Sequence, residues 1–137
     1  MTQRVAFDPH QDLAPIPFSP RLAESARRLK ALGLPWAPHV GCFVWDPQGL
    51  IGVPSPFPHN IYFILSLPRF EAIFGSREKI AHALVWLPTW HQARLLCARL
   101  GVSDGAAAAA GAAPEAGADL MALYDLLARA LEARGGV

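Results

Sequence analysis

The chain has 137 residues, which is the size of one domain and enough to bury about two thirds of the surface of the unfolded chain. A hydrophobic fraction of 53% and a charged fraction of 17% predict a well-filled core that needs no disulfide or metal, and a surface poor in charge. The net charge of +1 divides into +4 over residues 1–101 (ten basic, six acidic) and −3 over residues 102–137 (two basic, five acidic), a balance too weakly basic to favour a nucleic-acid-binding protein.

The N-terminal residues and the hydropathy of the chain indicate the cellular compartment in which we expect the protein. The first twelve residues contain neither an apolar stretch nor a small-residue cleavage site, so we expect no signal peptide. No apolar run approaches the ~18 residues of a membrane span. We therefore expect a cytoplasmic protein without membrane association, in which both cysteines are reduced.

The N-terminal third is predicted to form an arm followed by a helix. Residues 1–18 contain three prolines and are expected to lie extended on the body. Ser19 and Pro20 are typical of a helix N-cap and first position, and Gly33 is typical of a helix end. Leu22, Ala26 and Leu29 then form its buried stripe.

Three strands are predicted between residues 40 and 66, which is the densest apolar stretch of the chain. The first covers Val40 to Trp45, and the turn Asp46-Pro47-Gln48-Gly49 should return the chain into a second strand over Leu50 to Val53. The proline-rich stretch Pro54 to Asn60 is a stiff loop, and Ile61 to Leu65 is the third strand. Both faces of these strands are apolar, so the sheet must be covered on both sides.

Helices are predicted over most of the remaining chain. They cover Leu67 to Phe74, Arg77 to about Trp86, and Trp90 to Leu100, the last preceded by a Thr89–Gln92 capping box. Residues 103–117 are rich in Ala and Gly and are expected to form a mobile linker. An amphipathic helix over Asp119 to Arg134 follows.

These elements predict an α+β fold with a small antiparallel sheet of about three strands covered by helices, plus a tethered C-terminal amphipathic helix. The organisation is a body over residues 1–102 with its N-terminal arm, a linker over 103–117, and a C-terminal helix over 118–134, in a single domain overall.

A cleft beside the proline-rich loop is the predicted ligand-binding site. Loops held by prolines are pre-organised, and aromatic walls with a few polar groups are typical of small-molecule sites. The predicted ligand-binding residues are Trp36, His39, Trp45, Phe57, His59 and Asn60. The alternative is that Phe57 fills the core and the prolines only shape an edge.

Two sets of potential metal ligands are weaker site predictions than the cleft. Asp8, His10 and Asp12 alternate and would project from one side of an extended arm, but they match no ligand motif. His39, Cys42, His59, His91 and Cys97 lack the paired spacing of a zinc site, and both cysteines fall on buried stripes. We therefore predict no metal and no cofactor.

The C-terminal helix carries the strongest indication of an interaction. Leaving five large apolar side chains in water forfeits about 1.5 to 3 kcal/mol each, so this helix must dock. It docks either on its own body or on a second copy of the chain, and we expect a homo-oligomer, a dimer. The predicted interface residues are Leu120, Leu123, Tyr124, Leu127 and Leu131.

Three classes of function follow. The first is a non-catalytic small-molecule-binding or protein-interaction module that self-associates. The second is a small enzyme using His59 or His39 as a general base in the aromatic cleft. The third is a helix-turn-helix DNA-binding regulator, in which the helices over residues 77–86 and 90–100 meet at a short turn and His91, Gln92, Arg94 and Arg99 face the groove.

Overall fold

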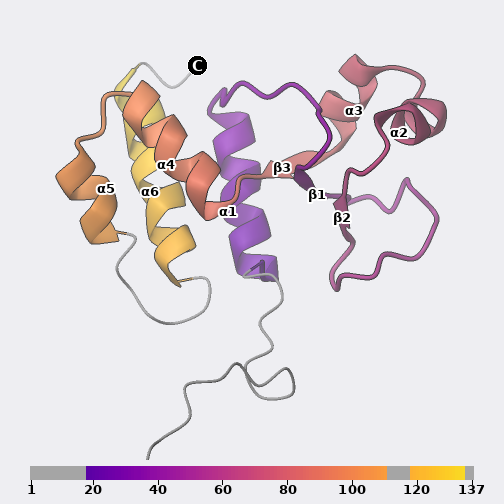
Figure 1. Ribbon diagram of the computed structural model, residues 1–137, viewed down its shortest axis with the longest axis horizontal. Coiled ribbons are helices and arrows are strands. Elements are labelled where there is room, and N and C mark those ends of the chain that lie inside the picture. Colours follow the sequence, from indigo (N-terminus) through magenta and orange to yellow (C-terminus); the bar gives the residue numbers. More distant parts are fainter. Residues whose placement is uncertain (1–17, 111–117, 135–137) are drawn as a thin grey trace, which may run out of the picture.

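The computed structural model describes residues 18–110 and 118–134, which adopt an α+β fold (Figure 1). The helices are α1 (Pro20–Ala31), α2 (Leu67–Phe74), α3 (Arg77–Ala83), α4 (Trp90–Arg99), α5 (Asp104–Ala110) and α6 (Ala118–Ala133). The strands are β1 (Phe43–Trp45), β2 (Ile61–Phe63) and β3 (Val85–Leu87). The α+β prediction with a three-stranded antiparallel sheet is confirmed.

The sheet has the order β2-β1-β3, and both neighbours run antiparallel to the central strand. Val44 lies opposite Tyr62 on one side and Trp86 on the other, so these three residues share a face of the sheet. Their neighbours in each strand point to the opposite face. This alternation divides the apolar side chains into two cores, one on each side of the sheet.

The larger core lies between the sheet and helices α1, α4 and α6. Figure 1 shows these helices, with α5, grouped on one side of the strands. Buried side chains from α1, α4 and α6 meet Ile61, Val85 and Leu87 of the sheet here. Phe43 and Trp45 of β1 pack against the same core.

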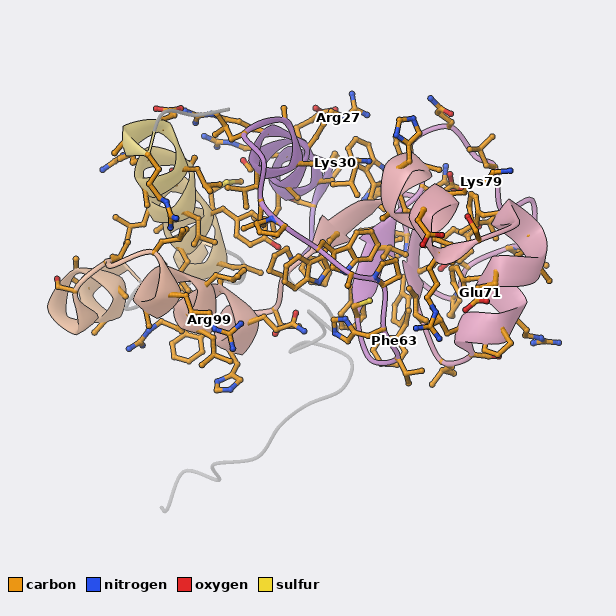
Figure 2. The ribbon with its side chains drawn as sticks, turned by 90° about the horizontal axis from the view of Figure 1, so that it is seen from above. Arg27, Lys30, Phe63, Glu71, Lys79 and Arg99 are labelled. Atoms are coloured by element: carbon orange, nitrogen blue, oxygen red, sulfur yellow. The ribbon has the colours of Figure 1, made fainter. Side chains whose placement is uncertain are left out.

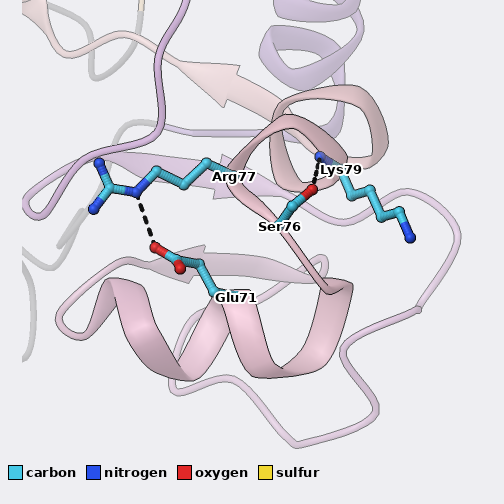
Figure 3. A network of polar contacts seen from close by, with 4 residues as sticks. All are labelled: Glu71, Ser76, Arg77 and Lys79. Atoms are coloured by element: carbon cyan, nitrogen blue, oxygen red, sulfur yellow. Dashed lines mark hydrogen bonds and ion pairs between the residues drawn. The ribbon is translucent and has the colours of Figure 1, made fainter.

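The smaller core lies on the opposite face, under α2 and α3. Cys42, Val44 and Ile64 from the sheet region are fully buried there, and so are Ile80 and Leu84 from α3 and its C-terminal end. The ion pair between Arg77 Nε and Glu71 Oε1, at 2.9 Å, joins α3 to α2, and the Ser76 hydroxyl accepts the Lys79 amide to cap α3 (Figure 3). Burial of both faces of the sheet is therefore observed, as the apolar pattern of its strands requires.

Helix ends follow their local sequence closely. Ser19 accepts a hydrogen bond from the Leu22 amide at 3.2 Å with Pro20 in the first turn of α1. Thr89 and Gln92 form the reciprocal capping box of α4. Gly75, with φ of 101°, ends α2 in the left-handed conformation that glycine adopts without steric cost. These signals act within a few residues, so the sequence predicts them well.

The prediction of a strand over Leu50 to Val53 is wrong. The predicted turn is present, because the Gly49 amide donates to the Asp46 carbonyl at 3.3 Å. The fully buried Asp46 carboxylate then accepts the Leu50 and Ile51 amides at 3.0 and 2.9 Å. These amides are therefore not free to donate β-ladder hydrogen bonds to β1, and β1 pairs instead with β2, beyond the proline-rich loop.

The prediction of a helix from Arg77 to about Trp86 is wrong at its end. Helix α3 ends at Ala83, and Val85–Leu87 form β3. This segment carries β-branched and aromatic residues before Pro88, which favours a strand.

The linker prediction is wrong for Asp104–Ala110, which form α5, with Ala107 buried in the larger core. Residues 1–17 and 111–117, on which the arm and the rest of the linker fall, lie outside the described residues.

Candidate functional site

The six residues predicted to line one cleft lie in three different places. Trp36 stacks on Trp86 with ring centroids 6.2 Å apart and planes 10° apart, and the His39 ring meets Trp86 edge-on at 6.5 Å. Trp36 and Trp86 pack against the smaller core. Trp36 also lines a hollow of about 280 Å³ with Arg77 and Glu78 of α3, and no residue of the proline-rich loop lines it.

Trp45 and Phe57 belong to the opposite face of the sheet. Phe57 lies edge-on to Phe43 at 5.7 Å, and both pack against the larger core, as the alternative interpretation of Phe57 expects. The Arg27 guanidinium lies 4.5 Å above the Trp45 ring, a cation–π contact. The thickness of the sheet therefore separates Trp45 and Phe57 from Trp36.

His59 and Asn60 form an exposed turn. Their φ values of 64° and 60° are left-handed, and the Ile61 amide donates to the Pro58 carbonyl at 3.3 Å, which is the pattern of a type I′ turn. His39 is also exposed, with its Nδ1 atom 3.0 Å from the Ala37 carbonyl. In the described part of the chain neither imidazole is hydrogen-bonded to a carboxylate.

The five residues predicted as an interface are buried inside the chain itself. Helix α6 packs on α1 and α4, and none of the five side chains is more than 7% exposed. The Tyr124 hydroxyl donates to the Pro88 carbonyl at 2.6 Å, which ties α6 to the segment between β3 and α4. The helix thus docks on its own body, and whether the protein also self-associates stays a prediction. The buried residues are Leu120, Leu123, Tyr124, Leu127 and Leu131.

The potential metal ligands are dispersed where the structure describes them. Cys42 and Cys97 are buried free thiols in different cores, and burial raises the pKa of both. The Cys42 thiol donates to the His39 carbonyl at 2.9 Å. Within residues 18–110 and 118–134 no three His, Cys, Asp or Glu side chains are grouped as metal ligands. Asp8, His10 and Asp12 lie outside the described residues.

The geometry expected of a helix-turn-helix is not present. Strand β3 separates α3 from α4, so a short turn does not join these helices. On α4, His91 and Arg99 are exposed, whereas Gln92 is half-buried in the capping box. The Arg94 guanidinium lies 5.1 Å from the Trp90 ring, on the same helix.

An apolar groove between α2 and the loop after β1 is the most distinctive surface feature. It encloses about 480 Å³, and Ile51, Val53 and Pro54 form its loop wall. Phe70, Ala72 and Ile73 of α2 form the other wall, with Tyr62 and Phe63 of β2 between them. Arg69 is the one charged side chain among the described residues that line it.

Two side chains hold the loop wall in place. Asp46 fixes the backbone at Ile51 through its amide, and the Tyr62 hydroxyl donates to the Val53 carbonyl. Ser55 donates to the Ile61 carbonyl and accepts the Phe57 amide at 3.1 Å, which secures the loop beyond the groove. Burial and the nearby Asp46 charge raise the pKa of Tyr62, so its hydroxyl stays a donor at neutral pH.

The sequence pointed to this region for a different reason. Pro54, at the groove wall, begins the proline-rich loop that we predicted to carry function. Ile51 and Val53 lie within the predicted strand over Leu50 to Val53, and no local sequence signal places them opposite α2. A helix with apolar residues remaining outside its buried stripe, such as Ile73 at 43% exposed, is the feature that could have indicated an open surface.

Comparison with protein-family models, curated proteins and solved structures found no match to this chain. Among the helices of the described residues, none combines the length and the apolar character required to cross a membrane.

Proposed function

We propose that this protein is a non-catalytic binding module whose apolar groove holds a segment of a partner protein. The observation that carries the proposal is the groove itself, an apolar hollow of about 480 Å³ whose two walls are fixed by the fold. Exposed apolar side chains that line a hollow in this way are typical of interaction sites.

The openness of the walls favours a protein segment over a small molecule. Val53 is 56% exposed and Ile73 is 43% exposed, so the groove is shallow at its rim. Sites for small molecules usually enclose most of the ligand surface. A peptide segment can cover these side chains with its own and extend over the rim.

The charge at the groove selects among partner segments. Arg69 lies in the wall and is exposed. A guanidinium can bind a carboxylate through two parallel hydrogen bonds. A partner segment with apolar residues next to an Asp or Glu would satisfy both features. A symmetric contact between two copies through this groove would instead bring two Arg69 side chains together, so the groove favours a different protein over self-association.

Selection from a display library of short random peptides on the full chain tests the proposal. We expect the selected peptides to combine apolar residues with an acidic one. Ile73→Asp should weaken their binding by roughly tenfold to a hundredfold, because it replaces an apolar contact with a charge. Leu95→Asp is the matched control, because Leu95 is equally exposed, at 45%, but lies on α4.

Arg69→Glu tests the charge at the same site. Its binding to the acidic peptides should fall by about tenfold, and variants of these peptides with Lys in place of the acid should recover the loss. A library that yields no peptides, or peptides that bind the Ile73→Asp variant as well as the wild type, would overturn the proposed function.

A further inference from the structure

A second hollow lies between α1, the turn after β1 and the end of α3, on a different surface from the apolar groove. It encloses about 640 Å³, within the range of small-molecule sites. The side chains that line it include Arg27, Lys30, Gln48 and His82, with no carboxylate among the described residues of its wall. Figure 2 shows Arg27 and Lys30 close together on α1.

Two positive charges share this wall. Arg27 and Lys30 lie three residues apart on α1, so their side chains project from neighbouring positions of one helix face. Burial lowers the pKa of Lys30, and the charge of Arg27 lowers it further. An anion placed near both cations would compensate their mutual repulsion, which is the smaller of the two effects.

The nearby negative groups are already engaged. Lys30 Nζ donates to the carbonyls of His82 and Leu84 at 2.5 and 2.9 Å, which neutralises the negative end of α3. At the end of α1, backbone amides satisfy the carbonyls of Arg28, Leu29 and Lys30. These bonds offset part of the negative charge at the C-terminal ends of the two helices.

Arg27 also remains available to a ligand. Its one ion pair among the described residues is with Glu24, at 3.6 Å, and both side chains are about half exposed, at 49% and 60%. An exposed pair of this kind contributes little free energy, so a ligand can compete with it. The stack on Trp45 holds the guanidinium in place at the hollow.

We propose that this hollow binds a small organic phosphate monoester, with its phosphate between Arg27 and Lys30. A phosphate monoester carries about −1.5 to −2 charges at pH 7, which matches the two cations better than a single carboxylate does. The apolar part of the ligand lies against Ala31, Ala83 and Val85. Gln48, exposed on the turn, adds a neutral donor at the rim.

Titration of the full chain with phenyl phosphate, followed by amide NMR shifts, tests this site. We expect shifts at Lys30, Ala31, Gln48 and Ala83, and binding about tenfold tighter than that of benzoate, which has the same ring but a single charge. Benzoate binding as tightly as phenyl phosphate would overturn the proposal. So would a titration without shifts at these residues.

Two variants leave the Lys30 bonds to α3 intact and so keep the test independent of folding. Arg27→Gln removes one cation, and Gln48→Glu adds a carboxylate on an exposed turn. Each should weaken phenyl phosphate binding by about tenfold or more. Arg99→Gln removes an exposed cation from α4, on another side of the molecule in Figure 2, and should leave binding unchanged. An equal loss in Arg99→Gln, or no loss in the two hollow variants, would also overturn it.

Discussion

At the scale of single residues, Asp46 decides how the chain leaves the central strand. Its carboxylate is fully buried and accepts two backbone amides, while its own amide donates to the Asn60 carbonyl at 2.9 Å. One residue therefore ends β1 and turns the loop toward α2 through its side chain, and aligns the start of β2 through its backbone amide. The apolar groove depends on this arrangement, because Ile51 is held by the same carboxylate.

Substitution of Asp46 by Asn should destabilise the protein by about 1–3 kcal/mol. An amide offers a single acceptor oxygen, and its NH2 group would face one of the two backbone amides without a partner. Urea unfolding measures the change. Asp125→Asn on α6, where the carboxylate accepts no described hydrogen bond, is the matched control and should change stability by less than about 0.5 kcal/mol. Equal stability of the two variants would show that the Asp46 bonds contribute nothing net.

The local sequence predicts part of the role of Asp46. An Asp at the first position of a Pro-Gln-Gly turn predicts the turn, and the turn is there. It does not predict that the carboxylate accepts hydrogen bonds from the Leu50 and Ile51 amides. The carboxylate and a strand partner compete for the same donors, and tertiary packing decides between them.

At the scale of elements, most helices and the strands β1 and β2 follow from the sequence, whereas β3 and α5 do not. Caps such as Thr89–Gln92 involve residues three apart, so the pattern that sets a helix end is visible in the sequence. Each strand has three residues, and although Val85–Leu87 carry residues that favour a strand, so short a segment can also continue the preceding helix. Their pairing with β1 joins residues about forty positions apart, and the apolar side chains that stabilise it come from both cores.

The Tyr124 hydroxyl joins α6 to Pro88, and burial of its phenol makes stability depend on pH. Burial raises the pKa of Tyr124 well above its usual 10.0, so the folded protein holds the neutral phenol while the unfolded chain ionises. This contribution is complete below about pH 10 and is lost as the pH rises toward the folded pKa.

Tyr124→Phe should therefore have two effects on the free energy of unfolding. Near neutral pH the variant should be less stable by about 1–3 kcal/mol, because the Pro88 carbonyl keeps no side-chain partner. Above about pH 10 its stability should decline less steeply than that of the wild type. Tyr62→Phe, at a half-buried phenol, is the control and should keep most of the alkaline decline. An unchanged decline in Tyr124→Phe would contradict the assignment.

At the scale of the whole molecule, two cores share one small sheet, and the C-terminal helix completes the larger of them. Leu123 and Leu127 of α6 are fully buried among side chains of the rest of the chain. The division into two cores also separates the residues of the predicted cleft. Trp36 and Trp45 are apolar residues near one another in sequence, but the sheet places them in different cores, and a period of two along a strand cannot show which core receives each face.

Docking of α6 within one chain predicts that thermal stability does not depend on protein concentration when the protein is monomeric. Between about 2 and about 200 µM the unfolding midpoint should stay constant within about one degree, because folding then involves a single chain. If α6 were exchanged between two copies, the same interval would raise the midpoint by several degrees, since association adds up to about 2.7 kcal/mol per hundredfold in concentration.

Self-association through another surface would leave Leu127 buried in its own chain, and sedimentation of Leu127→Ala would distinguish this case from exchange of α6. With docking in cis, that variant is less stable by about 2–5 kcal/mol but keeps its oligomeric state, whereas an exchanged dimer would dissociate.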